Sequence, residues 1–76
     1  MDKLKKIFSR VLGVEESSIT PETSPVNTPE WDSLRAIVLL TELEQSFGVV
    51  FDLDEAMAVK NVEGAAALLR KKGVAL

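Results

Sequence analysis

The sequence predicts an all-α fold: a four-helix bundle with a long first loop and a short third helix. Apolar residues recur at helical spacing in several segments, and no segment alternates convincingly as a half-buried strand would. Glycines follow three of these segments, at Gly13, Gly48 and Gly73, where helices commonly end. With 76 residues, 46% of them apolar and 28% charged, the chain has the composition of a globular protein. We expect residues 1–76 to form a single domain.

The first helix is expected to start with Asp2 as its cap and to end at Gly13. Its apolar face consists of Leu4, Ile7, Phe8, Val11 and Leu12. A polar connection containing three prolines follows, from about Val14 to Asp32. Ile19 is its expected buried anchor.

The second helix is predicted from about Ser33 to Phe47, with Gly48 ending it. Thr28 and Pro29 form an alternative capping pair, which would place Ser33 in the second turn. Residues 49–51 are apolar, but no partner strand is visible, so we interpret them as a connection.

Two short helices complete the bundle. Asp54 is expected to cap a third helix that runs through Val59. Asn61 is expected to cap the fourth, from Val62 to Lys72, which ends at Gly73.

The second helix has more apolar residues than its core face requires. Its core face is predicted to contain Ala36, Leu39, Leu40, Leu43 and Phe47. Leu34, Ile37 and Val38 lie toward the opposite side with Thr41, where a surface helix should be polar. Because so small a domain does not easily enclose a helix on all sides, we interpret this strip as a binding surface for a partner.

Charge is partitioned along the chain. Both ends are basic, whereas residues 13–59 contain ten acidic residues and only Arg35 as a base. This acidic field surrounds Ser33. It favours partner proteins with basic surfaces and disfavours nucleic acid.

The composition excludes several classes of site. The chain has no Cys and no His, which argues against disulfides, a metal site and a Ser-His nucleophile. No acid-base pair can be assembled either, so we expect no enzyme. The apolar runs are shorter than a membrane span, and the first residues lack the apolar core of a signal peptide. We therefore expect a cytoplasmic protein.

Ser33 is the candidate functional residue. It lies in Trp31-Asp32-Ser33-Leu34, where the polar loop meets the most apolar predicted helix. Free backbone N–H groups and the positive end of the helix dipole favour a phosphate at such a position. With no base to activate it, Ser33 is expected to be modified rather than to catalyse.

These residues resemble the acyl carrier protein family, whose signature is Asp-Ser-Leu at the start of the second helix. The long first loop, Phe47-Gly48, Asp54-Glu55-Ala56 and Asn61-Val62 extend the resemblance over essentially the whole chain. It implies a four-helix bundle of acyl carrier type, with 4′-phosphopantetheine from coenzyme A esterified to Ser33 by a separate phosphopantetheinyl transferase. The thiol of this arm would carry acyl groups as thioesters between enzymes of fatty acid, polyketide or other specialised biosynthesis.

The resemblance also implies a recognition surface for the transferase and the partner enzymes. Its expected members are Asp32, Leu34, Arg35, Ile37, Val38, Thr41, Glu42 and Met57. Asp32 caps the helix or meets a basic transferase surface, and the two roles are compatible. The expected partners are acyl-loading, synthase or transferase enzymes with basic surfaces, and we expect a monomer.

Three positions depart from the family pattern and favour a dedicated carrier of a specialised pathway. Arg35 and Val38 stand where carriers of primary fatty acid synthesis tend to have acids, and Met57 stands where an acid is common. Such changes exclude the wrong partner. The alternative role for Arg35 is an exposed pair with Glu30 or Asp32.

Two other functions remain open from the sequence. A peptidyl or aminoacyl carrier has the same fold and arm with a different cargo. A small helical interaction module would use the apolar strip without any prosthetic group.

Overall fold

The computed structural model describes residues 2–76 and has four α-helices with no strand in that range. The elements are α1 (Asp2–Leu12), a 3-10 turn η1 (Glu16–Ser18), α2 (Ser33–Phe47), α3 (Leu53–Ala58) and α4 (Val62–Lys71). The predicted all-α fold is confirmed, including the connection at residues 49–51. The 3-10 turn inside the first loop was not predicted.

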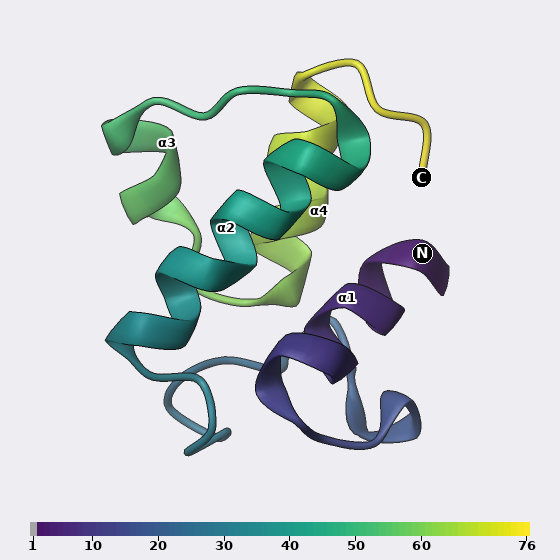
Figure 1. Cartoon of the computed structure of the whole chain (residues 1–76), viewed down its shortest axis with the longest axis vertical. Coiled ribbons are helices and arrows are strands. Elements are labelled where there is room, and N and C mark those ends of the chain that lie inside the picture. The colour runs from purple at the N-terminus through teal and green to yellow at the C-terminus, as the bar shows by residue number, and fades with distance from the viewer. Residues whose placement is uncertain (1) are drawn as a thin grey trace.

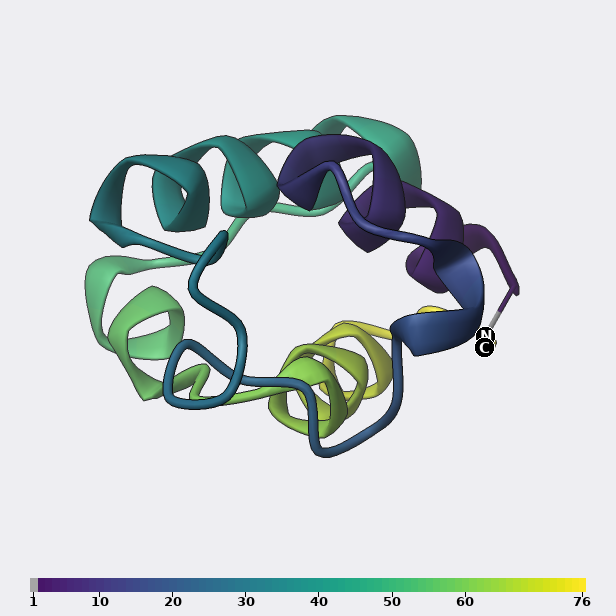
Figure 2. The same ribbon diagram turned by 90° about the horizontal axis from the view of Figure 1, so that it is seen from below.

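The long helix α2 runs across the molecule, with α1 packed beside it and α4 on its far side (Figure 1). The short helix α3 lies away from α1, beside α2 and α4 (Figures 1 and 2). Seen from below, the helices surround a common centre, and the first loop closes that end of the bundle (Figure 2). The start of α2, where Ser33 lies, is therefore at the end of the bundle that this loop covers.

The core is formed by the predicted faces of α1, α2 and α4. Its most completely buried large side chains include Leu4, Phe8, Leu12, Ile19, Leu39, Leu43, Val62 and Leu69. Ile19 is buried, which confirms it as the anchor of the first loop. The loop is also pinned to the start of α4, because the N–H groups of Val62 and Glu63 donate to the carbonyls of Thr23 and Pro21, each at 3.0 Å.

Both ends of α2 match the predicted range from Ser33 to Phe47. Asp32 has extended backbone angles and its side chain accepts from the Arg35 N–H, so Asp32 is the cap and the alternative start at Thr28 is wrong. Gly48 ends the helix with φ at 66°, a left-handed conformation that costs glycine little.

The cap of α3 was predicted two residues too late. Asp52, rather than Asp54, accepts from the Glu55 N–H at 2.8 Å, and the Glu55 side chain accepts from the Asp52 N–H at 3.0 Å. This reciprocal pair is a capping box, which requires an acid or amide three residues after the cap; Asp54 has Met57 at that position. α3 ends at Ala58 rather than Val59. Asn61 caps α4 as predicted, and α4 ends at Lys71 rather than Lys72.

Glu55 also connects α3 to the end of α4. Its carboxylate lies 2.7 Å from Lys72 Nζ and 3.8 Å from Lys71 Nζ. The hydrogen bond to Lys72, followed by that from the Asp52 N–H, lowers the pKa of Glu55 from its ordinary value of 4.5. Because no residue of α3 is fully buried, this polar contact contributes to its attachment.

We expect Glu55→Gln to destabilise the protein near neutral pH and to matter less in acid. A carboxyl whose pKa is lowered by folding stabilises the fold above its unfolded pKa, and this stabilisation disappears as pH falls through the folded pKa. The difference in unfolding free energy between wild type and variant should therefore shrink as the pH falls below 4.5. Urea unfolding at several pH values measures it. Glu16→Gln, which removes an exposed carboxylate with no hydrogen bond or ion pair in residues 2–76, is the matched control. A difference that stays constant with pH would contradict the prediction.

Candidate functional site

Ser33 is the first residue of α2, and its side chain is exposed. Within residues 2–76 its hydroxyl makes no hydrogen bond, and neither do the backbone N–H groups of Ser33 and Leu34. These two N–H groups belong to the first turn, where the helix dipole is positive. The position therefore offers a free hydroxyl beside two free donors, a suitable environment for a phosphate ester.

Asp32 fixes the geometry of this turn. Its Oδ1 accepts from the Arg35 N–H at 2.9 Å, and its backbone carbonyl accepts from the Ala36 N–H at 2.9 Å. The cap satisfies the third donor of the turn and leaves the first two free. Asp32 itself remains exposed, so it is also available to a partner.

Trp31 anchors the chain two residues before Ser33. Its side chain is buried and packs edge to face on Phe8 of α1, with ring centroids 5.3 Å apart and planes at 63°. No role was predicted for Trp31 from the sequence. The signal it carried was a large aromatic residue within an otherwise polar loop.

Arg35 has contacts that the sequence did not predict. Its Nη1 donates to the carbonyl of Leu12 at 3.2 Å and to that of Glu30 at 3.3 Å. Leu12 is the last residue of α1, where carbonyls lack helical partners and a positive charge is favourable. Arg35 thus joins the end of α1 to the loop before Ser33, and it forms none of the salt bridges seen in residues 2–76.

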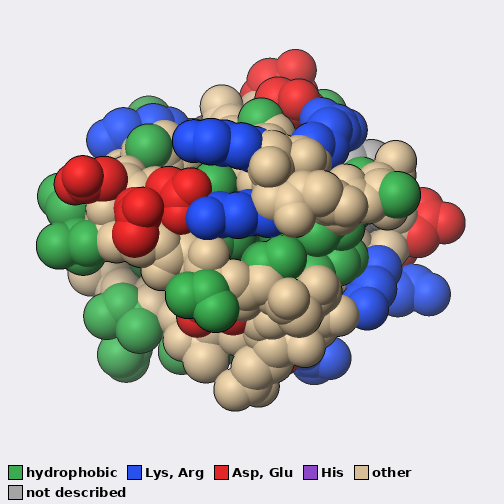
Figure 3. All heavy atoms as spheres, turned by 90° about the horizontal axis from the view of Figure 1, so that it is seen from above, with side chains coloured by type: hydrophobic (Ala, Val, Ile, Leu, Met, Phe, Trp, Pro, Cys, Tyr) green, Lys and Arg blue, Asp and Glu red, His purple; other side chains and the backbone are tan. Residues whose placement is uncertain are grey.

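The apolar strip on α2 is exposed, as predicted. The exposed fractions are 71% for Leu34, 64% for Ile37 and 42% for Val38, and Met57 of α3 adds another exposed side chain at 66%. Thr41 lies on the same side, but its hydroxyl donates to the carbonyl of Ile37 at 3.0 Å. Figure 3 shows hydrophobic side chains gathered on the side of the molecule where α3 lies, next to acidic ones.

The acids in the second half of α2 have partners within the protein. Glu42 pairs with Arg10 of α1 at 2.8 Å. Glu44 accepts from the N–H of Phe51 at 2.8 Å and so holds the connection to α3. The field near Ser33 therefore includes acids that also serve the fold.

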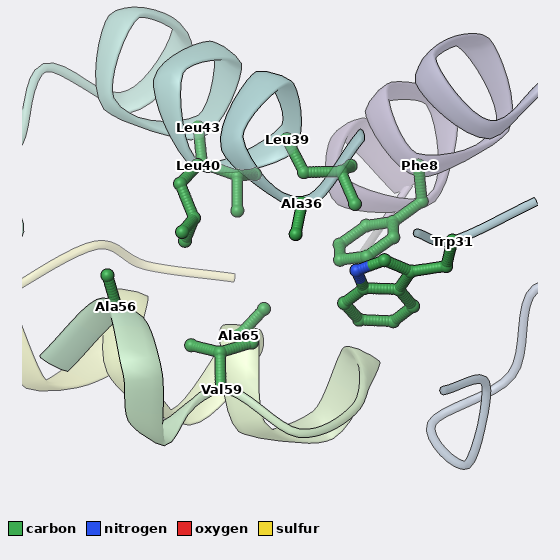
Figure 4. Close-up of a pocket in the computed structure, with 9 residues that line it drawn as sticks. All are labelled: Phe8, Trp31, Ala36, Leu39, Leu40, Leu43, Ala56, Val59 and Ala65. Carbon is green, nitrogen blue, oxygen red and sulfur yellow. The ribbon is translucent and has the colours of Figure 1, made fainter. Parts of the chain in front are cut away.

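A groove and a cavity lie next to Ser33, and the sequence predicted neither. The groove, of about 400 Å³, starts at Ser33 and runs between α2 and α3, with Ile37, Leu53 and Met57 among its walls. Behind it lies a partly open apolar cavity of about 40 Å³, lined by side chains from α1, the first loop, α2, α3, α4 and the residue after α3 (Figure 4). Both depend on where α3 sits, which no local pattern encodes.

This geometry suits a prosthetic group attached by a phosphate ester. An exposed hydroxyl, two free N–H donors and an adjacent groove are present together, whereas the chain has no histidine to activate the serine. The arrangement can receive and shelter a group that another enzyme attaches.

The family model described as "Phosphopantetheine attachment site" matches residues 2–69. An acyl carrier protein of Rubrobacter xylanophilus is 40% identical over 65 residues, which cover 86% of this chain and 80% of that protein. One of Nitratidesulfovibrio vulgaris is 34% identical over 71 residues, or 93% of each chain. A solved structure from Mycobacterium tuberculosis, described as a candidate acyl carrier protein, matches with a TM-score of 0.82 over 92% of this chain and 93% of that one. Its sequence identity is 24%, so it supports the fold alone.

Proposed function

Because this chain belongs to the acyl carrier protein family, we propose that Ser33 is the residue to which its 4′-phosphopantetheine is attached. Proteins of this family are carriers rather than enzymes. When bound, the arm supplies a terminal thiol that holds acyl groups as thioesters. The observation that supports Ser33 most strongly is its free hydroxyl at the first position of α2, immediately after the cap Asp32.

The residues around Ser33 have separable tasks in this proposal. The N–H groups of Ser33 and Leu34 face the phosphate and stabilise its negative charge. Asp32 holds the first turn, and buried Trp31 keeps that turn fixed relative to the core. The hydroxyl is left accessible to the transferase.

The test is direct loading of the wild-type protein. Incubation with coenzyme A and a broad-specificity phosphopantetheinyl transferase should add one phosphopantetheine to the intact mass, and fragmentation should locate it on Ser33. An unchanged mass, or an arm on another residue, would contradict the proposal.

The carrier role implies partner enzymes, and we propose that they dock on the exposed strip of Leu34, Ile37 and Val38 with Met57 of α3. Large exposed apolar side chains gathered on one surface are typical of binding sites. Polar residues border the strip: Asp32, Arg35, Thr41 and Glu42. They would set how a partner with a basic surface is oriented when it docks on the strip. A single domain that acts as a monomer leaves this surface free. Within residues 2–76, no helix is both long and apolar enough to cross a membrane.

We propose further that the carrier serves a specialised pathway and that Arg35 excludes partners adapted to acidic carriers. Arg35→Asp should improve acyl transfer by enzymes of fatty acid synthesis and impair transfer by the native partner. Transfer rates measured across ionic strength would show it, because a charge effect weakens as salt screens it.

The contacts of Arg35 require a control in that experiment. Arg35→Asp also removes the hydrogen bonds to Leu12 and Glu30, so it should cost about 0.5–1.5 kcal/mol of stability per bond lost. Arg35→Gln removes the positive charge without adding an acid and separates the two effects. If Gln and Asp variants behave alike with every enzyme at low salt, Arg35 is a structural residue and the specificity proposal fails.

A further inference from the structure

One polar group lies on the wall of the otherwise apolar cavity behind the groove. It is the indole N–H of Trp31, a residue only 5% exposed. This N–H makes no hydrogen bond within residues 2–76, although buried tryptophan N–H groups usually have a partner. Figure 4 shows the nitrogen on the edge of the indole that faces the cavity.

The indole N–H is not sealed inside the protein. In the described part of the chain, every side-chain nitrogen or oxygen that is fully shut off from solvent has a hydrogen-bond partner. Since the Trp31 N–H has no partner, it must border space that a small molecule can reach. It is therefore a donor available to a ligand.

The cavity is reached from the side on which Ser33 lies. Ala36, Leu40, Ala56 and Val59 line both the groove that starts at Ser33 and the cavity behind it. A group tethered to Ser33 and lying in the groove would meet the cavity through these side chains, with Trp31 on its wall.

The size of the cavity limits what enters. A group the size of a water molecule needs about 10–15 Å³ of cavity volume. The cavity of about 40 Å³ therefore accommodates roughly three such groups. The wall at Trp31 does not yield readily, because the indole is packed on Phe8, which is itself 1% exposed. A polar arm with amide groups is excluded by the apolar walls, so the part that enters is the acyl chain beyond the thioester.

We propose that this carrier selects a short acyl group with an oxygen beyond the thioester, and that Trp31 is the residue that recognises this oxygen through its indole N–H. The proposal rests on attachment of the arm at Ser33. Beyond its thioester carbonyl, a four-carbon acyl group with a hydroxyl or oxo group has three carbons and one oxygen, which is close to the size of the space, and its oxygen offers the N–H an acceptor. A plain chain of equal length would displace water from the N–H without replacing its hydrogen bond.

The single tryptophan of the chain makes the test specific, because its indole N–H gives one signal in a nitrogen-proton NMR spectrum. The protein is loaded with the unacylated arm, with butyryl or with 3-hydroxybutyryl, and intact mass confirms each product. The indole proton should move downfield with 3-hydroxybutyryl and stay close to its unacylated position with butyryl. An equal shift with all three forms, or no shift with any, would overturn the proposal.

Thioester cleavage by hydroxylamine provides a second readout. Relative to the corresponding coenzyme A thioesters, the 3-hydroxybutyryl form should be protected roughly fivefold more than the butyryl form, the factor that a typical net hydrogen bond supplies. Trp31→Phe keeps an aromatic ring on Phe8 but removes the N–H, so the two cargoes should become equal. Val74→Ala alters a half-buried side chain that does not line the cavity and should preserve the difference. A difference that survives in Trp31→Phe would overturn the assignment, whereas failure to load would instead contradict attachment at Ser33.

Discussion

Replacing Ser33 by alanine should abolish attachment of 4′-phosphopantetheine completely. In the proposed attachment the Ser33 hydroxyl oxygen forms the phosphate ester, so without it no arm should be attached and no acyl group carried. The fold should be unaffected, because Asp32 caps α2 and the Ser33 hydroxyl makes no hydrogen bond within residues 2–76. Intact mass after incubation with coenzyme A and a transferase measures the loss.

Ser17→Ala is the matched control for this experiment. Ser17 is also exposed and also follows an acidic residue, but it lies in the 3-10 turn of the first loop rather than at the start of a long helix. It should load as the wild type does. Retained loading of Ser33→Ala would show that the arm is attached elsewhere, and the site described above would be wrong.

Leu43→Ala should produce a large loss of stability. Leu43 is 1% exposed and lies on the core face of the helix, where it also borders the interior cavity. Truncation removes buried apolar surface and enlarges the cavity, which typically costs about 2–5 kcal/mol. Since small domains have total stabilities of about 5–15 kcal/mol, this is a large fraction. Urea unfolding gives the difference in free energy.

Val38→Ala is the control on the opposite face of the same helix. Val38 is 42% exposed, so its truncation should change stability by only about 0.5 kcal/mol while weakening transfer to partner enzymes. Equal destabilisation by the two substitutions would contradict the division of α2 into a core face and a binding face.

The helix boundaries that could be predicted are those encoded by adjacent residues. Gly48 ends α2 because its backbone is left-handed, and Asn61 caps α4 through a hydrogen bond to Gly64, three residues later. Asp52 was missed because two acids lie near the start of α3, and only the reciprocal bond with Glu55 distinguishes them. Such a choice between neighbouring caps is decided by side-chain geometry.

The site was predictable to a similar extent. The exposure of Leu34, Ile37 and Val38 follows from helical periodicity, because the opposite face of α2 packs in the core. The contact between Arg35 and the carbonyl of Leu12 joins residues 23 positions apart, so it depends on how α1 and α2 are placed. The pairing of Glu42 with Arg10 has the same origin, since it spans 32 positions.

The sequence by itself determined that this chain is a four-helix carrier with a serine at the start of its second helix. Periodicity, caps and the Asp-Ser-Leu signature each involve only a few neighbouring residues, so they can be recognised from the sequence alone. Only the tertiary structure placed Trp31 against Phe8, brought α3 beside α2 and left a groove that leads from Ser33 to an apolar cavity. These features arise from packing between segments distant in the chain, where the volume left between side chains depends on all of them together.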